Sequence, residues 1–180
     1  MQPTATTYTP PLSPEMEERL TSSLLSLHKE RINTDLRRLG AVQYDMRLPE
    51  THSLPLIIRP EEHINGVVYG RYSQTSGHKV GRGVLVATDF RMLLVDKKPL
   101  FLRCDEITYG AISAITYGRA GIGIAIILHT RMGDIHLRTF NRACAVNFVE
   151  DVERSIFSIR QRTSSIADSR IELVEERGAS

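Results

Sequence analysis

The sequence predicts a mainly β domain of about seven short strands, closed by a C-terminal helix and preceded by a long amphipathic N-terminal helix. Between Val84 and Phe140, apolar blocks alternate with turn signals at short intervals, which is typical of consecutive antiparallel strands. On both sides of this region, apolar residues recur every three or four positions, which is the period of a helix with one buried face.

Composition sets limits on the class of protein. The 180 residues are 41% hydrophobic and 24% charged, which favours one folded domain with extensions. The formal net charge of +2 and the absence of Trp argue against nucleic acid as a partner. No apolar run has the length of a membrane span or of a signal peptide, so we expect a cytoplasmic location.

The N-terminal region divides into an arm and a helix. Residues 1–13 are rich in Pro and Thr, and we expect this arm to be disordered. Ser13 and Pro14 form a helix start, and Gly40 lies where a left-handed C-cap is needed. The sequence therefore predicts an amphipathic helix over residues 14–40.

This helix is longer than a small β domain can cover, because about 26 residues extend about 39 Å. Part of its apolar stripe could pack against another subunit, with Leu20, Leu24 and Leu27 as interface candidates. Packing on its own domain is equally compatible with the pattern, and periodicity does not separate the two possibilities.

The remaining chain divides into a connector, a domain and a tail. Residues 41–60 are turn-rich, and the patch from Leu54 to Ile58 could form one edge strand. Strands are expected from Gly66 to Phe140, within a domain over residues 61–162. Asn141 is a candidate N-cap for a helix that ends near Arg162. We expect residues 163–180 to be a polar tail that is loose or weakly docked.

Two segments of this region resemble bacterial pleckstrin-homology-like (PH-like) domains, closest to the YokE-like group. The run from Gly83 to Asp96 is similar to that family's strand, Thr-Asp-x-Arg turn and next strand. Asp105 to Ile115 is similar to its later acid-Ile-Pro-Tyr and Ile-Ser/Thr segment, although Thr108 replaces the proline. The resemblance implies a partly open barrel capped by a helix, in binding or assembly modules without established catalysis.

The turn residues in the first segment have structural tasks. Thr88 and Asp89 can hold a tight turn through their side chains, and Arg91 can pair with an acid. A ligand-binding role for Arg91 is the less favoured alternative.

Basic residues cluster around the expected first hairpin, where some PH domains bind anionic lipid head groups. The candidates are Arg71, His78, Lys79 and Arg82, because converging cations match phosphate charge. The alternative is a solvated loop.

A two-residue turn at Met132-Gly133 would place His129 directly opposite His136. Two histidines without a third ligand are a weak candidate for a metal site, and the favoured interpretation is an exposed cross-strand pair. The same register predicts one core face with Ile126, Leu128, Ile135 and Leu137. On the other face, Ile127 and Phe140 could be covered by a neighbouring subunit or by the chain itself.

No catalytic arrangement is recognisable. The glycines around Arg119 precede a β-branched run, so they predict a hairpin turn and not a phosphate loop. Cys104 and Cys144 fit no zinc or redox spacing, and we expect both to be reduced and buried. No cofactor is expected. The sequence favours a non-catalytic module that self-associates or binds a protein partner, with anionic membrane binding as the alternative.

Overall fold

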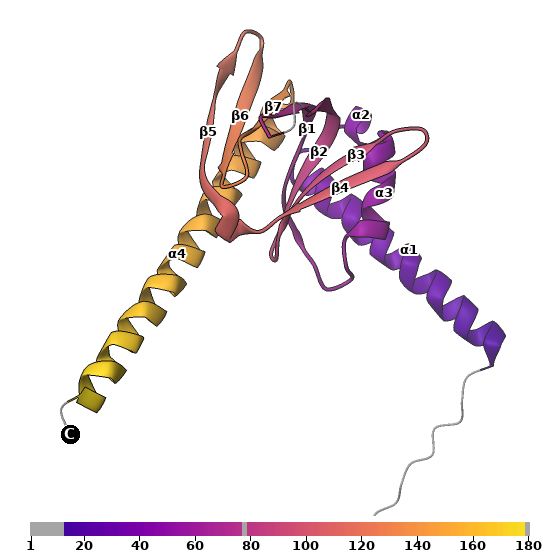
Figure 1. The fold of residues 1–180 in the computed structure, drawn as a ribbon. Coiled ribbons are helices and arrows are strands. Elements are labelled where there is room, and N and C mark those ends of the chain that lie inside the picture. Colours follow the sequence, from indigo (N-terminus) through magenta and orange to yellow (C-terminus); the bar gives the residue numbers. More distant parts are fainter. Residues whose placement is uncertain (1–12, 77–78, 179–180) are drawn as a thin grey trace, which may run out of the picture.

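A seven-stranded antiparallel sheet forms the centre of the molecule, with three helices before it and one long helix after it (Figure 1). The computed structural model describes residues 13–76 and 79–178, and from residue 162 onward it describes only the course of the helix. The elements are α1 (Pro14–Arg38), α2 (Gln43–Met46), α3 (Pro49–Ile57), β1 (Ile64–Gln74), β2 (Lys79–Thr88), β3 (Met92–Lys97), β4 (Leu102–Ile107), the 3-10 turn η1 (Tyr109–Ala111), β5 (Ile112–Ala120), β6 (Gly123–Thr130), β7 (Ile135–Thr139) and α4 (Arg142–Gly178).

The strands follow the order β4-β3-β2-β1-β7-β6-β5, so β4 and β5 are the two edges. The sheet curves around an inner core that contains residues from both of its halves, and α4 closes this core with Phe148 and Val152. The predicted fold class, a PH-like partly open barrel with a C-terminal helix and a long N-terminal helix, is confirmed.

A second core lies on the opposite, outer face of β1, β2 and β3. There Ile32 and Leu36 of α1 and Leu54 of α3 pack against side chains such as Val86. The strands in the middle of this half are therefore covered on both faces, which favours continuous apolar runs over alternation. The burial pattern agrees, because β3 is buried over five consecutive residues, whereas β7 alternates between buried and exposed positions.

Helix α1 packs on its own domain over only part of its length. Its C-terminal half is buried in the outer core through Ile32 and Leu36, and Gly40 follows it with a φ of 98°. The N-terminal half projects away from the sheet (Figure 1). In this free half, Leu20, Leu24 and Leu27 are 47%, 65% and 63% exposed.

The connector contains helix α3 where an edge strand was expected, so that prediction was wrong. Leu54 and Ile58 are buried in the outer core, whereas Leu56 between them is 77% exposed. A strand would place all three side chains on one face, but a helix separates position 56 from positions 54 and 58. Pro49 at the start of α3 also favours a helix.

The C-terminal helix is longer than expected. It continues to Gly178, so the expected end near Arg162 was wrong. The reason is visible in the sequence, because residues 163–177 contain neither Pro nor Gly, the two residues that most strongly interrupt a helix. Whether residues 163–178 dock on the domain stays a prediction. The predicted arm lies almost entirely in residues 1–12, which are outside the described residues.

Both cysteines are free, but only Cys144 is buried. The expectation that Cys104 is buried was wrong, because it lies on the edge strand β4, whose alternation turns it outward. Within the part of the chain that the structure describes, no helix is both long and apolar enough to cross a bilayer.

Candidate functional site

A basic groove of about 860 Å³ lies on the outer face of the sheet, beyond the part covered by α1 and α3. The start of α4 and the segment that contains α2 border it. The six basic side chains of its lining are Arg71, Arg82, Lys97, Lys98, Arg138 and Arg142. Its apolar side chains include Val42, Tyr44, Leu48, Pro49 and Phe140.

Strand pairing places three arginines in one row across this groove. Arg71 of β1 is directly opposite Arg82 of β2 on one side and Arg138 of β7 on the other. Directly opposite residues point to the same face of a sheet. Gly70 allows β7 to approach this closely, since a Cβ at that position would lie 2.2 Å from the carbonyl oxygen of Arg138.

The cations of the groove are sparsely neutralised. Arg138 donates a 2.8 Å hydrogen bond from Nη2 to the carbonyl oxygen of Ala120, and Lys98 pairs with Asp96 at 2.9 Å. Among the described residues, no side-chain hydrogen bond or ion pair reaches Arg71, Arg82 or Lys97. Guanidinium groups held together in this way are suited to bind an anion.

A hydrogen-bond network fixes the wall of the groove. The side chain of Asn141 caps α4 by accepting a bond from Cys144 N at 3.2 Å, as the sequence predicted. Its Nδ2 donates to the carbonyl oxygen of Gly40 at 2.9 Å and to Asp45 Oδ2 at 3.0 Å. Asp45 also accepts a bond from the backbone N of Val42. The ends of α1, α2 and α4 are therefore tied together beside the basic row.

The structure separates the predicted anionic-ligand residues. Arg71 and Arg82 lie in the groove, whereas Lys79 lies further along the hairpin opposite Gln74 and does not line it. His78 is outside the described residues. Sequence reasoning missed the other four basic residues of the groove, Lys97, Lys98, Arg138 and Arg142. Finding Arg138 would have required the long-range pairing of β1 with β7.

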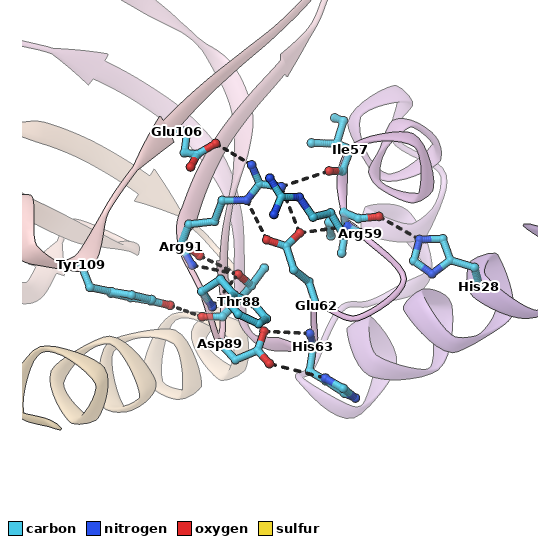
Figure 2. Close-up of polar contacts among 12 residues, drawn as sticks. His28, Ile57, Arg59, Glu62, His63, Thr88, Asp89, Arg91, Glu106 and Tyr109 are labelled. Atoms are coloured by element: carbon cyan, nitrogen blue, oxygen red, sulfur yellow. Dashed lines mark hydrogen bonds and ion pairs between the residues drawn. The ribbon is translucent and has the colours of Figure 1, made fainter. Parts of the chain in front are cut away.

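Arg91 is part of a buried ion-pair network (Figure 2). Its Nε and Nη2 donate to the two carboxylate oxygens of Glu62 at 2.7 and 3.0 Å, and its Nη1 pairs with Glu106. Nη2 also reaches the carbonyl oxygen of Ile57 at 3.3 Å. The expected pairing of Arg91 with an acid is confirmed, and the network joins the connector to β3 and β4.

The burial of this network is nearly complete at Glu62, whose side chain is 1% exposed. Burial raises the pKa of Glu62, but the hydrogen bonds from Arg91 and from the backbone N of Arg59 outweigh it and hold the pKa below its usual range. In turn, the hydrogen bond to Glu62 raises the pKa of Arg91. With its carboxylate partners in place, this guanidinium is not available to a ligand.

The Thr88 side chain holds the turn before Arg91 as the sequence predicted, whereas the Asp89 side chain ties the turn to His63. Thr88 Oγ1 accepts bonds from the backbone N of Phe90 and of Arg91 and donates to the carbonyl oxygen of Arg91. Asp89 accepts a 3.0 Å bond from the backbone N of His63, which Figure 2 also shows. These contacts make the turn a structural element.

The predicted pairing of His129 with His136 was wrong by two residues. His136 is opposite Ile127, and His129 Nδ1 lies 3.1 Å from Asp134 Oδ2. The cause is a longer turn, in which Thr130 Oγ1 accepts a bond from Met132 N and donates to the carbonyl oxygen of Gly133. Within the described ranges, no group of three metal-ligating side chains converges.

A shift of two residues keeps every side chain on its predicted face. Ile126, Leu128, Ile135 and Leu137 are accordingly in the inner core. On the other face Ile127 is half-buried, and Phe140 is exposed at the groove. These two interface candidates lie on the sheet, apart from the three leucines of the free half of α1.

Comparison with known proteins identifies the family. A profile described as Bacterial PH domain matches residues 58–154, which is more than half of the chain. The chain belongs to this family. The narrower YokE-like assignment is not confirmed, and no curated protein matches the sequence.

Solved structures with a similar PH fold share little sequence with this chain. The N-terminal PH domain of Vps36 has 16% identity and a TM-score of 0.45, with 58% of this chain and 86% of that one covered. A DUF1696 family protein with a pleckstrin-homology domain from Shewanella loihica PV-4 has 16% identity and a TM-score of 0.39, with 59% and 86% covered. The C-terminal domain of an unknown protein from Leishmania infantum has 17% identity and a TM-score of 0.39, with 59% and 90% covered.

PH domains are generally non-catalytic modules that bind proteins or lipids. Membership in the family therefore indicates a binding or scaffold role for this chain, and a fold by itself names no partner.

Proposed function

We propose that this PH domain is a cytoplasmic, non-catalytic assembly module that associates with a second copy of itself through the free half of α1. The observation that carries the proposal is the exposure of Leu20, Leu24 and Leu27 on one helix face. Further along α1, a different side of the helix, with Ile32 and Leu36, is buried against the domain. Among the side chains that the structure describes, none covers this apolar face of the free half.

The charges of α1 favour a second copy in antiparallel orientation. The beginning of the free half is net acidic, with Glu15, Glu17 and Glu18 against Arg19, and its end is net basic, with Lys29 and Arg31 against Glu30. In an antiparallel pair, the acidic end of each helix lies over the basic end of the other, while the leucines meet in the middle. A two-fold interface of this kind is the commonest form of homodimer.

The apolar area is sufficient for an association of moderate strength. Burying a leucine side chain completely contributes about 1.5–3 kcal/mol, and these side chains are between half and two thirds exposed. Three from each copy then contribute on the order of 5–10 kcal/mol, which is comparable to the association cost of about 4–15 kcal/mol. We therefore expect a dimer that dissociates on dilution.

Light scattering over a range of concentrations tests this proposal. The wild type is expected to approach the mass of a dimer, and Leu24→Asp/Leu27→Asp is expected to remain a monomer with an unchanged circular dichroism spectrum. Leu100→Asp is the matched control, because Leu100 is also highly exposed but lies in the β3–β4 hairpin. A monomeric wild type, or a dimer that survives the double substitution, would refute it. Deletion of all of α1 is a poorer test because it also removes Ile32 and Leu36.

The second candidate function is the binding of anionic lipid head groups through the first hairpin, with Lys79 near its tip and Arg71 and Arg82 further along the two strands. It is favoured by the apolar side chains beside the cations of this region, since Val80 follows Lys79 and is exposed. The test is cosedimentation with vesicles of phosphatidylcholine and with equimolar phosphatidylcholine and phosphatidylserine. Binding that is equal for both vesicles, or unchanged in Lys79→Glu, counts against this function.

A further inference from the structure

We propose that the basic groove is a binding site for a phosphorylated ligand with an apolar or ring-shaped body, whose phosphate is held by Arg71, Arg82 and Arg138. The site lies on the outer face of the sheet, away from the free half of α1. The inference therefore stands independently of self-association.

The first argument is the placement of like charges. Arg71 has an arginine directly opposite on both neighbouring strands, and like charges facing each other across a strand pair oppose folding. Arg71 and Arg82 have no acidic partner within the described residues. An anion in the groove would supply the missing counter-charge.

The second argument is that these cations line a recess and not an open face. Its volume of about 860 Å³ is within the range of about 300–1,000 Å³ that is usual for small-molecule sites. Phosphate is the anion that the geometry favours, because several guanidinium groups can each donate two bonds to its oxygens.

The third argument concerns the body of the ligand. Tyr44, Leu48, Pro49 and Phe140 line the groove beside the arginines, and aromatic and proline side chains offer flat apolar contacts. A bare inorganic ion would leave these surfaces without a contact. The lining therefore fits a phosphate attached to an apolar or planar group.

The start of α4 adds to the positive potential. Asn141 and Arg142 line the groove, and a helix N-terminus carries a partial positive charge. The two acids of the lining, Asp45 and Glu50, are fewer than its six basic side chains. Asp45 is also occupied by bonds from Val42 N and from Asn141.

Isothermal titration with soluble probes tests the site. Phenyl phosphate combines a phosphate with an aromatic ring, and inorganic phosphate provides the anion alone. We expect phenyl phosphate to bind more tightly than inorganic phosphate, and binding to fall at least tenfold in Arg71→Gln/Arg82→Gln. Arg119→Gln is the matched control, because Arg119 is an exposed arginine of β5 outside the groove.

A lipid is the other source of the same chemistry, so vesicles of equimolar phosphatidylcholine and phosphatidic acid form a second arm. Binding to these vesicles without binding of phenyl phosphate, if it depends on Arg71 and Arg82, supports the site and assigns it to a lipid. Absence of binding in both arms overturns the proposal. Binding that the double variant and Arg119→Gln reduce equally also overturns it.

A thermal melt of the ligand-free proteins guards against a purely structural role for the two arginines. The Arg71→Gln/Arg82→Gln variant is expected to melt no lower than the wild type, because the substitution relieves the opposed charges. A lower melting temperature would show that these arginines serve stability, and it would contradict the proposal.

Discussion

Replacing Arg91 by alanine tests whether the ion-pair network around Glu62 holds the connector onto the sheet. The substitution removes both side-chain hydrogen bonds to Glu62, whose side chain is 1% exposed, and leaves only the bond from the backbone N of Arg59. Breaking a buried pair by removing one partner costs about 3–5 kcal/mol, because an uncompensated charge remains buried. The lost contact with Glu106 adds little, since that carboxylate is half exposed.

For a chain of this length, such a loss lowers the melting temperature by roughly 6–20 °C. Urea unfolding at neutral pH, followed by circular dichroism, measures the free energy directly. The double variant Glu62→Gln/Arg91→Ala is the control, because it removes the buried charge together with its partner. We expect it to be more stable than Arg91→Ala.

The pH dependence gives a further check on the cause. In the wild type, the pKa of Glu62 is held below the unfolded value of 4.5, so its stabilising contribution is present above that value and is lost as the pH falls through the folded pKa. In Arg91→Ala, burial acts without Arg91 and raises the pKa of Glu62, so protonation in acid relieves the variant. The difference in stability between the two proteins should therefore be largest near neutral pH and begin to shrink as the pH falls through the variant's raised pKa, which lies above 4.5.

The reasoning would be refuted by a loss below about 1 kcal/mol, which is the range of an exposed pair. It would also be refuted by a stability difference that is the same at pH 4 and pH 7.

Three further changes test other contacts. Ellman's reagent should modify only Cys104 in the folded protein, because Cys144 is buried and burial raises the pKa of its thiol to about 12. Rapid modification of both thiols in the folded protein would contradict this prediction. Gly70→Ala should cost about 1–3 kcal/mol or more in urea unfolding, because its Cβ would meet a β7 carbonyl oxygen. Gly118→Ala is the control and should hardly change the free energy of unfolding, because no atom lies within 4 Å of the added Cβ. An equal loss of stability in Gly70→Ala and Gly118→Ala would argue against a clash at Gly70. Asn141→Ala should lower the free energy of unfolding by about 2 kcal/mol in the same assay, because it removes the helix cap and two donated hydrogen bonds. An unchanged stability would show that solvent replaces these hydrogen bonds.

The strands and the inner core were predictable because their signals are local. The alternation in β6 and β7 assigns Ile126 and Leu137 to the core without knowledge of the turn between them. A register error of two residues changes which side chains face each other but leaves each on its own face. For this reason the core face was predicted correctly and the histidine pair was not.

The basic groove was not predictable in the same way, because its row joins residues that are far apart in the chain. Arg71 and Arg138 meet only because β1 pairs with β7, and no local pattern reports that pairing. The wrong assignment of residues 54–58 has a different cause. A short apolar run fits either a strand or a helix, and here the outer core, which requires Leu54 and Ile58 on one side, decides for the helix.

The outer core depends on residues that lie before the start of the family match. The family profile begins at residue 58, but the side chains that cover the outer face of β1, β2 and β3 come largely from residues 32–58. A fragment cut at the limits of the match would expose this apolar face to water, and it is expected to aggregate. The segment that matches the family profile is therefore shorter than the segment needed for a stable domain. A fragment intended for purification must begin before Ile32.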